Sequence, residues 1–331
     1  MKNKKLLVTG GVGFIGSEFV RQGIRRGYKI AVIDKLTYAG DLARLSSEQG
    51  KYNFYKIDIC DEKKLKNVFK KEKPQVVINF AAETHVDRSI LKSSSFIETN
   101  VRGTQILLDE SRKPNINKFI QISTDEVYGD IKNGKFDEKA PFNPSSPYSA
   151  SKAAADCLVK AYIRTYNFPA IILRPSNNYG PWQYPEKFIP VAVFKSFNNK
   201  KIPLYAKGSN EREWLYVSDC IDAVFLVLKK ARLGEIYNIG SGIEKKNIDV
   251  AKSILKVLGK SEKLIEFVKD RPGHDYRYAL DSTKIIKLGW KPKIRFKEGI
   301  AETTSWNIKN QRWVKRKAGF LKEYWQKVYK I

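Results

Sequence analysis

The chain has 331 residues and 42% hydrophobic content, which is enough to bury a sizeable core and predicts an ordered globular protein. Its net charge of +27 comes largely from lysines scattered over helical faces such as residues 61–73, so we expect no nucleic-acid partner and keep that role only as an alternative. The widely spaced Cys60, Cys157 and Cys220 indicate no disulfide framework and no metal site and favour a cytoplasmic location, and no apolar run is long enough to predict a membrane partner.

The N-terminal segment carries the pattern of a dinucleotide site. Residues 5–9 are expected to form a buried strand, which runs into the glycine-rich segment 10–16 (GGVGFIG) and then a helix. Such glycines permit a tight turn and a close approach of the backbone to a pyrophosphate at the helix N-terminus. The next predicted strand, Lys29–Ile33, ends in Asp34, where an acid would hold ribose hydroxyls and favour NAD over NADP.

Further short apolar segments alternate with amphipathic helical stretches along the first half of the chain. The predicted strands are Phe54–Ile57, Gln75–Ala81, Lys118–Ser123 and Ala170–Arg174. This alternation predicts an α/β fold, a Rossmann-type doubly wound parallel sheet with helices on both faces. Ligands of such folds bind beyond the carboxyl ends of the strands, and the candidate site residues follow the strands here at Gly10, Asp34, Asp58, residues 82–85 and residues 124–126.

Tyr148 and Lys152 form a candidate acid/base pair. They are four residues apart in a predicted helix, so they share a face, and we expect the ammonium to lower the pKa of the phenol. A phenolate that removes a hydroxyl proton at neutral pH needs such a cationic neighbour.

Asp125 and Glu126 offer a second acid/base pair shortly before Tyr148. A dehydrogenase that only removes a hydride from an alcohol does not need this pair. An enzyme that also expels water needs one group to take a carbon-bound proton and another to protonate the departing hydroxyl. The two pairs together therefore predict oxidation followed by elimination.

The composition changes near Ser176 to loops rich in Pro, Trp and Tyr. We expect residues 1–175 to form the NAD-binding domain and residues 176–331 mainly to form a smaller C-terminal lobe that binds the substrate. The boundary is approximate and allows the chain to cross between lobes. Residues 301–331 carry several tryptophans among basic residues and are expected to form a helical tail packed on the body.

The sequence resembles the extended short-chain dehydrogenase/reductase superfamily and, within it, the dTDP-glucose 4,6-dehydratase family. The resemblance covers nearly the whole chain. The motifs that carry it, in order, are GGVGFIG (10–16), DKLTYAG (34–40), AAETHVDRSI (81–90), FIETN (96–100), STDEVYG (123–129), YSASK (148–152), NNYGPWQYPEKFIP (177–190) and DRPGHDYRY (270–278). The acidic couple at residues 125–126 is the specific element, since related epimerases and decarboxylases generally lack it.

The resemblance implies a set of site residues for an NAD-dependent nucleotide-sugar dehydratase. The catalytic residues would be Thr124, Asp125, Glu126, Tyr148 and Lys152. The NAD site would comprise Gly10, Gly13, Phe14, Ile15, Gly16, Asp34, Lys35, Asp58, Ile59, Ala81, Thr99, Tyr148, Lys152 and Asn178. The nucleotide-sugar partner would contact Thr84, Asn177, Lys187, Tyr205, Arg212, Asn247, Arg271 and His274, and a homodimer is implied.

The implied reaction converts an NDP-hexose, with dTDP-glucose expected, into its 4-keto-6-deoxy derivative. Tyr148, aided by Thr124 and Lys152, would support oxidation at C4, and Asp125 and Glu126 would eliminate water across C5 and C6. The hydride would return to C6, so the cofactor would end as it began. A C4 epimerase or decarboxylase of the same superfamily remains an alternative, because these enzymes need only the Tyr-Lys pair.

Three segments depart from the family pattern. Arg174-Pro-Ser replaces the more usual Asn-Cys-Ser, Trp182-Gln183 replaces Tyr-His, and an extra acid lies beside Arg212. These changes fall near the expected nucleotide-sugar pocket. They leave dTDP-, UDP-, GDP-linked and N-acetylated sugars open as substrates.

Overall fold

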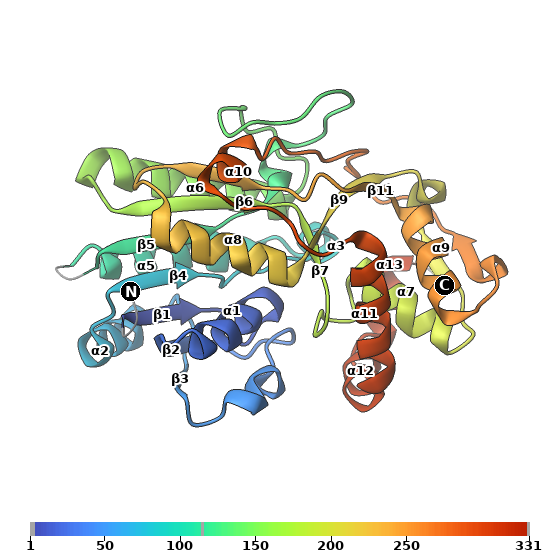
Figure 1. Cartoon of the computed structure of the whole chain (residues 1–331), viewed down its shortest axis with the longest axis horizontal. Helices are drawn as coiled ribbons and strands as arrows, with labels where there is room; N and C mark the ends of the chain where they lie inside the picture. The colour runs from blue at the N-terminus through green and yellow to red at the C-terminus, as the bar shows by residue number, and fades with distance from the viewer. Residues whose placement is uncertain (1–3, 114–115, 330–331) are drawn as a thin grey trace.

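The computed structural model describes residues 4–113 and 116–329, and Figure 1 shows a large sheet-based lobe beside a smaller, mainly helical one. The large sheet has the strand order β10-β6-β5-β4-β1-β2-β3, and all of its neighbouring strands are parallel. Its strands are β1 (Lys5–Thr9), β2 (Lys29–Asp34), β3 (Tyr52–Lys56), β4 (Val76–Asn79), β5 (Lys118–Ile122), β6 (Ala170–Pro175) and β10 (Ile236–Ile239). The predicted Rossmann-type sheet is confirmed, and no predicted strand end differs from the observed one by more than two residues.

Helices cover both faces of this sheet. One face packs against α1 (Phe14–Arg25), α8 (Val217–Lys230) and α10 (Thr283–Leu288), where Phe19 stacks on Phe225 with ring centroids 4.5 Å apart. The other face packs against α2 (Glu62–Glu72), α5 (Gly103–Ser111) and α6 (Pro147–Tyr166). Because helices cover both faces, the five inner strands β6, β5, β4, β1 and β2 are mainly apolar and buried, whereas the edge strand β3 is partly exposed.

The start of α6 is fixed by its sequence. The Ser146 hydroxyl caps the helix by accepting a hydrogen bond from the Ser149 amide at 3.1 Å. In return, the Ser149 hydroxyl accepts a hydrogen bond from the Ser146 amide. Pro147 occupies the first turn, where its missing amide proton costs nothing. This helix carries Tyr148 and Lys152 in its first turns, next to the carboxyl end of β5.

After residue 176 the chain enters the smaller lobe, and it returns to the large lobe from α8 to β10. The segment from α8 to β10 lies on the large sheet, with α8 packed against α1 and β10 paired with β6. The smaller lobe holds β7 (Asn177–Tyr179), β9 (Glu211–Tyr216) and β11 (Glu244–Lys246) in one sheet and β8 (Ile202–Leu204) with β12 (Ile265–Phe267) in another. Its helices are α7 (Phe188–Phe197), α9 (Asn247–Leu258), α11 (Phe296–Lys309), α12 (Gln311–Gly319) and α13 (Lys322–Tyr329).

The remaining elements are short. They are the helices α3 (Val86–Leu91), α4 (Ser94–Phe96), η1 (Leu42–Glu48), η2 (Ile97–Arg102), η3 (Asp125–Tyr128), η4 (Tyr205–Gly208) and η5 (Glu262–Leu264). The expected helical tail is present as α11 to α13, apart from residues 330 and 331, which lie outside the described residues. Within the described residues, no helix is both long and apolar enough to cross a membrane.

Candidate active site

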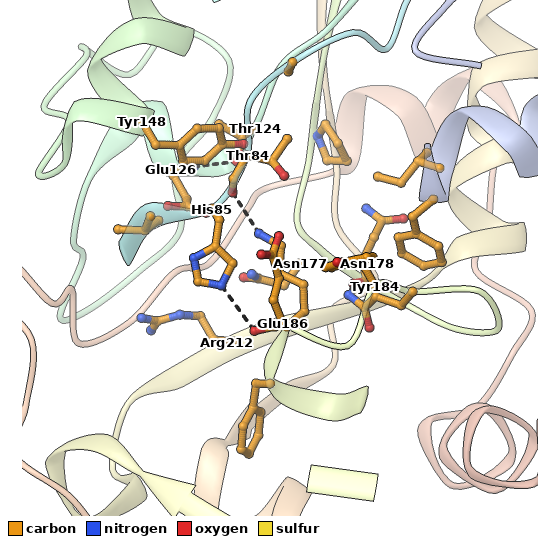
Figure 2. Close-up of a pocket in the computed structure, with 18 of the residues that line it drawn as sticks. Thr84, His85, Thr124, Glu126, Tyr148, Asn177, Asn178, Tyr184, Glu186 and Arg212 are labelled. Atoms are coloured by element: carbon orange, nitrogen blue, oxygen red, sulfur yellow. Dashed lines mark hydrogen bonds between the residues drawn. The ribbon is translucent and has the colours of Figure 1, made fainter. Parts of the chain in front are cut away.

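A cavity of about 370 Å³ lies between the two lobes at the carboxyl ends of the central strands. It is the place at which a doubly wound sheet binds its ligands. Figure 2 shows Tyr148, Thr124, Glu126 and Thr84 together at one part of its wall, with Asn177 and Asn178 farther along the cavity. All five predicted catalytic residues and all eight predicted substrate residues line this cavity.

Tyr148 and Lys152 are buried on the cavity side of α6, as expected from their spacing. The Lys152 ammonium donates a hydrogen bond to the Ile122 carbonyl at 2.6 Å, so the end of β5 fixes its position. The Tyr148 ring packs edge-on against Phe96, with ring centroids 6.3 Å apart. Thr124, which follows Ser123 directly, lies near Tyr148 and lowers the pKa of its hydroxyl.

The pKa of Tyr148 shifts upward in this arrangement of protein groups, which is opposite to the predicted direction. Burial raises the pKa of Tyr148 well above its usual value, the charges of Glu126 and Asp125 raise it further, and Thr124 opposes the shift. Burial also lowers the pKa of Lys152 to about 8. Lys152 therefore loses its positive charge only slightly above neutral pH.

Asp125 and Glu126 lie side by side on the 3₁₀ turn η3, but their surroundings differ. Burial raises the pKa of Asp125 well above its usual value, and the nearby charges of Glu126 and Glu213 add to this. Burial also raises the pKa of Glu126, but Arg271, Lys187 and Arg212 oppose the shift. Asp125 thus suits a proton donor and Glu126 a base, because different environments separate two carboxyl groups into these roles.

The cations that oppose this shift form the basic part of the cavity. Lys187 donates a hydrogen bond to the Thr84 carbonyl at 2.8 Å. Arg271 contacts Asp87 at 3.1 Å, and Arg212 donates to the Asp275 carbonyl at 2.9 Å. Guanidinium groups held in this way offer planar, forked donors to phosphate oxygens.

His274, Tyr205 and Asn247 line the cavity with the basic residues. The His274 ring lies edge-on to the Tyr205 ring at 5.7 Å between centroids, and its Nδ1 is 2.6 Å from an Asp270 carboxylate oxygen. Burial and the charges of Arg271 and Arg212 lower the pKa of His274 to about 4. His274 is therefore a neutral side chain at pH 7 and offers hydrogen bonds rather than charge.

The predicted cofactor residues divide into two groups. Eight of them line the cavity: Gly10, Gly13, Phe14, Ile15, Gly16, Tyr148, Lys152 and Asn178. Six lie outside its lining: Asp34, Lys35, Asp58, Ile59, Ala81 and Thr99. Among these, Asp34 accepts hydrogen bonds from the Val12 amide at 3.2 Å and the Leu36 amide at 2.8 Å, so it supports the glycine-rich turn directly.

The cavity fits a dinucleotide on two observations. Gly10 has φ +64°, and a Cβ there would lie 2.6 Å from the Ala81 amide nitrogen, so only glycine permits this turn against the end of β4. Ser176 Oγ, Asn177 Oδ1 and Gln183 Oε1 line the cavity and have no hydrogen-bond partner among the described residues. Buried polar atoms of this kind require a partner, which a polar ligand in the cavity supplies.

Sequence reasoning missed several residues of the wall. They include Arg44, Asp87, Gln183, Glu186 and Tyr278. Most lie inside the motifs at residues 81–90, 177–190 and 270–278, so the motifs themselves were the available signal. Arg44 lies in no such motif, and only the fold brings it to the site.

A parallel sheet of this order, the glycine-rich turn and the Tyr-x-x-x-Lys pair define an extended short-chain dehydrogenase/reductase. Residues 7–303 match the family model described as GDP-mannose 4,6 dehydratase. The chain therefore belongs to this family of nucleotide-sugar dehydratases.

Individual relatives agree with this assignment. A dTDP-glucose 4,6-dehydratase from Streptomyces niveus is 45% identical over 318 residues, which cover 93% of this chain and 94% of the relative. The crystal structure of a dTDP-glucose 4,6-dehydratase from Streptomyces venezuelae with NAD and TYD bound has a TM-score of 0.92 and 42% identity, covering 95% of this chain and 99% of that one. A UDP-glucose 4-epimerase from Thermotoga maritima has a TM-score of 0.88 and 29% identity, covering 93% of this chain and 99% of that one.

Proposed function

We propose that this protein is an NAD-dependent hydro-lyase that converts dTDP-glucose into dTDP-4-keto-6-deoxyglucose. The observation that carries the proposal is the pair Asp125 and Glu126 on the cavity wall beside Tyr148. An epimerase of the same fold has no use for two additional carboxyl groups at this point. The family membership and the dTDP-glucose dehydratase relatives support the same reaction.

The glycine-rich turn, Asp34 and Asn178 would hold NAD, which, when bound, takes a hydride from C4 of the hexose and returns it to C6. Tyr148 removes the C4 hydroxyl proton, assisted by Thr124, which lowers its pKa, and by the positive charge of Lys152 one turn along α6 in the same cavity wall. A ketone at C4 makes the C5 proton acidic. Glu126 then takes the C5 proton, and Asp125 protonates the C6 hydroxyl so that it leaves as water.

Binding of the nucleotide diphosphate is assigned to the cationic part of the cavity. Arg212, Arg271 and Lys187 are held by carbonyls or carboxylates of the protein and line the same wall as Asn247 and His274. These cations also make Glu126 more acidic, so substrate binding and elimination share the same electrostatic environment. Thr84 and Asn177 lie nearer the hexose end of the cavity in this assignment.

The decisive experiment incubates purified protein with a panel of dTDP-, UDP-, GDP- and CDP-hexoses and measures the product masses. Loss of one water from dTDP-glucose is the expected result. Loss of water from another nucleotide sugar would correct the substrate and keep the reaction. An unchanged mass would indicate epimerisation, and loss of carbon dioxide would indicate decarboxylation.

The proposal extends to the assembly and cellular setting. A cytoplasmic homodimer without nucleic-acid or membrane partners fits the free cysteines Cys60, Cys157 and Cys220 and the scattered positive charge. The division into an NAD-binding domain (1–175) and a substrate-binding lobe (176–331) is also proposed. In this division the segment from α8 to β10, together with α10, is the part of the second half that packs on the large sheet.

A further inference from the structure

Arg44 is a buried arginine in the wall of the cavity, close to the glycine-rich turn. It lies in η1, which begins after Asp41 caps the Ala43 amide at 3.0 Å, and only 1% of Arg44 is exposed. The residue lines the same cavity as Gly10, Gly13 and Gly16. No step of the proposed reaction uses it.

The Arg44 guanidinium connects three segments that are distant in the sequence. Its Nη1 donates to the Val12 carbonyl of the glycine-rich turn at 2.9 Å and to the Ala39 carbonyl of the loop after β2 at 2.6 Å. Its Nε and Nη2 donate to the Trp182 carbonyl of the smaller lobe at 3.1 and 3.0 Å. One side chain therefore ties the phosphate-binding turn to the opposite lobe across the cavity.

Trp182, the partner in the smaller lobe, has an unusual backbone. Its φ of +69° is left-handed, a conformation that bulky residues rarely adopt unless their surroundings enforce it. Its ring lies 4.7 Å from the Trp306 ring and 5.3 Å from the Trp313 ring, measured between centroids. The carbonyl that this conformation presents is the one that Arg44 binds.

Helix α12, near the C-terminus, contacts both η1 and the Arg44 side chain. Asp41, which caps η1, accepts a hydrogen bond from Trp313 Nε1 at 3.0 Å and contacts Lys317 Nζ at 2.8 Å. The Trp313 ring also lies 5.3 Å from the Arg44 guanidinium. Trp313 and Lys317 lie beyond residue 303, where the match to the family model ends.

The charge of Arg44 is incompletely compensated by the protein. Among the described residues, every hydrogen bond of its guanidinium goes to a main-chain carbonyl, and no carboxylate forms an ion pair with it. Burial lowers its pKa to about 10, and the charges of Asp41 and Asp34, neither of which forms an ion pair with it, oppose that shift, so it stays cationic at neutral pH. A buried cation without an ion-pair partner is costly, and an anion bound at the adjacent glycine-rich turn would stabilise it.

We propose that Arg44 is a positioning residue that retains NAD, by closing the two lobes over the diphosphate of the cofactor and supplying it with positive charge. This inference rests on the proposed function, in which the cofactor must stay bound between oxidation at C4 and reduction at C6. Retention then depends on a tie between lobes, and loosening the tie releases the cofactor without altering the catalytic groups.

The test measures how fast bound NAD exchanges with isotopically labelled NAD in excess, with no sugar nucleotide present. Arg44→Gln keeps a hydrogen-bond donor but removes the positive charge and the forked set of guanidinium donors. We expect bound NAD to exchange about ten- to hundred-fold faster in this variant. Arg44→Lys restores the charge and is expected to recover part of the retention. Arg232→Ala, which removes an exposed guanidinium in the loop between α8 and β10, is the matched control and should exchange like the wild type.

Equal exchange rates for Arg44→Gln and the wild type would overturn the inference. A wild-type protein that binds no NAD would instead overturn the proposed function, so the two failures are distinguishable. If Arg44→Gln does not fold, Trp313→Phe decides, because it keeps an aromatic ring at this position and removes the hydrogen bond to Asp41. Several-fold faster exchange in Trp313→Phe would support the inference, and an unchanged rate would refute it.

Discussion

Arg174 in β6 and Asp156 in α6 form a fully buried ion pair, with Nε 2.9 Å from the carboxylate and side-chain exposures of 1% and 0%. Asp156 lies one helical turn beyond Lys152, and its negative charge raises the Lys152 pKa that burial lowers to about 8. Arg174 begins the Arg-Pro-Ser run that departs from the family pattern. The ion pair accounts for Arg174: its positive charge balances the buried carboxylate of Asp156, which in turn acts on the catalytic Lys152.

Asp156→Asn should move the alkaline limb of the kcat profile to lower pH. Removal of the carboxylate lowers the Lys152 pKa below about 8, so Lys152 loses its positive charge, and its assistance to Tyr148, earlier as the pH rises. The variant should also lose about 3–5 kcal/mol of unfolding free energy, because Arg174 is left buried and unpaired.

The double variant Asp156→Leu with Arg174→Met controls for that stability loss. It removes both charges, so it should regain much of the unfolding free energy while keeping the shifted alkaline limb. The measurements are pH–rate profiles and denaturant unfolding. An alkaline limb of Asp156→Asn that coincides with the wild type would show that Asp156 does not set the charge of Lys152.

Asp125→Asn should separate oxidation from elimination. Burial holds the pKa of Asp125 well above its usual range, so it is suited to deliver a proton, whereas asparagine has none to give. Oxidation at C4 should stay intact, and loss of water should slow by about a hundred-fold or more. NADH absorbance should then accumulate on the enzyme.

Glu298→Gln, an exposed carboxyl substitution on α11, provides the control and should turn over normally. Normal turnover of Asp125→Asn without any NADH signal would remove Asp125 from the mechanism.

Tyr148→Phe should abolish oxidation. The ring and its edge-on contact with Phe96 remain, so NAD and the sugar nucleotide should still bind with near-normal affinity. Without the hydroxyl, the C4 proton has no acceptor, and kcat should fall by at least about a hundred-fold. Calorimetry checks binding, and absorbance checks that no NADH forms with any substrate. Near-normal turnover would disprove the assigned base.

His274→Ala should raise KM by roughly several-fold to tenfold and leave kcat nearly unchanged. His274 lies with Tyr205 in the cationic part of the cavity, so its contacts act equally on ground and transition states. Because its pKa is about 4, the contribution should not vary between about pH 6 and 8. A large fall in kcat with unaltered KM would place His274 at the reacting atoms.

Much of the sheet and cavity could be predicted from local patterns. Residues 5–34 encode a strand, a glycine-rich turn, a helix and a second strand by short-range chemistry, and the structure contains these elements. The carboxyl ends of parallel strands meet at one edge, so the acids at residues 125–126 and the pair Tyr148 and Lys152 could be placed together before the fold was known.

Other features depend on contacts between distant segments. The return of β10 to the sheet edge follows from pairing with β6, for which residues 236–239 carry no distinctive pattern. In the sequence, nothing distinguishes Arg44 from a surface arginine. Its proposed role in retaining NAD follows from its contact with Trp182, 138 residues away. The pKa of Tyr148 was misjudged because burial and the neighbouring carboxylate outweigh the lysine four residues away.

The most direct measurement uses dTDP-glucose deuterated at C4 and follows mass and label position in the product. The proposed reaction predicts a product that has lost one water and carries the deuterium at C6, since the hydride removed from C4 returns to C6 of the same molecule. A product of unchanged mass, or one that has lost water without deuterium at C6, would contradict internal oxidation and elimination as the function of this site.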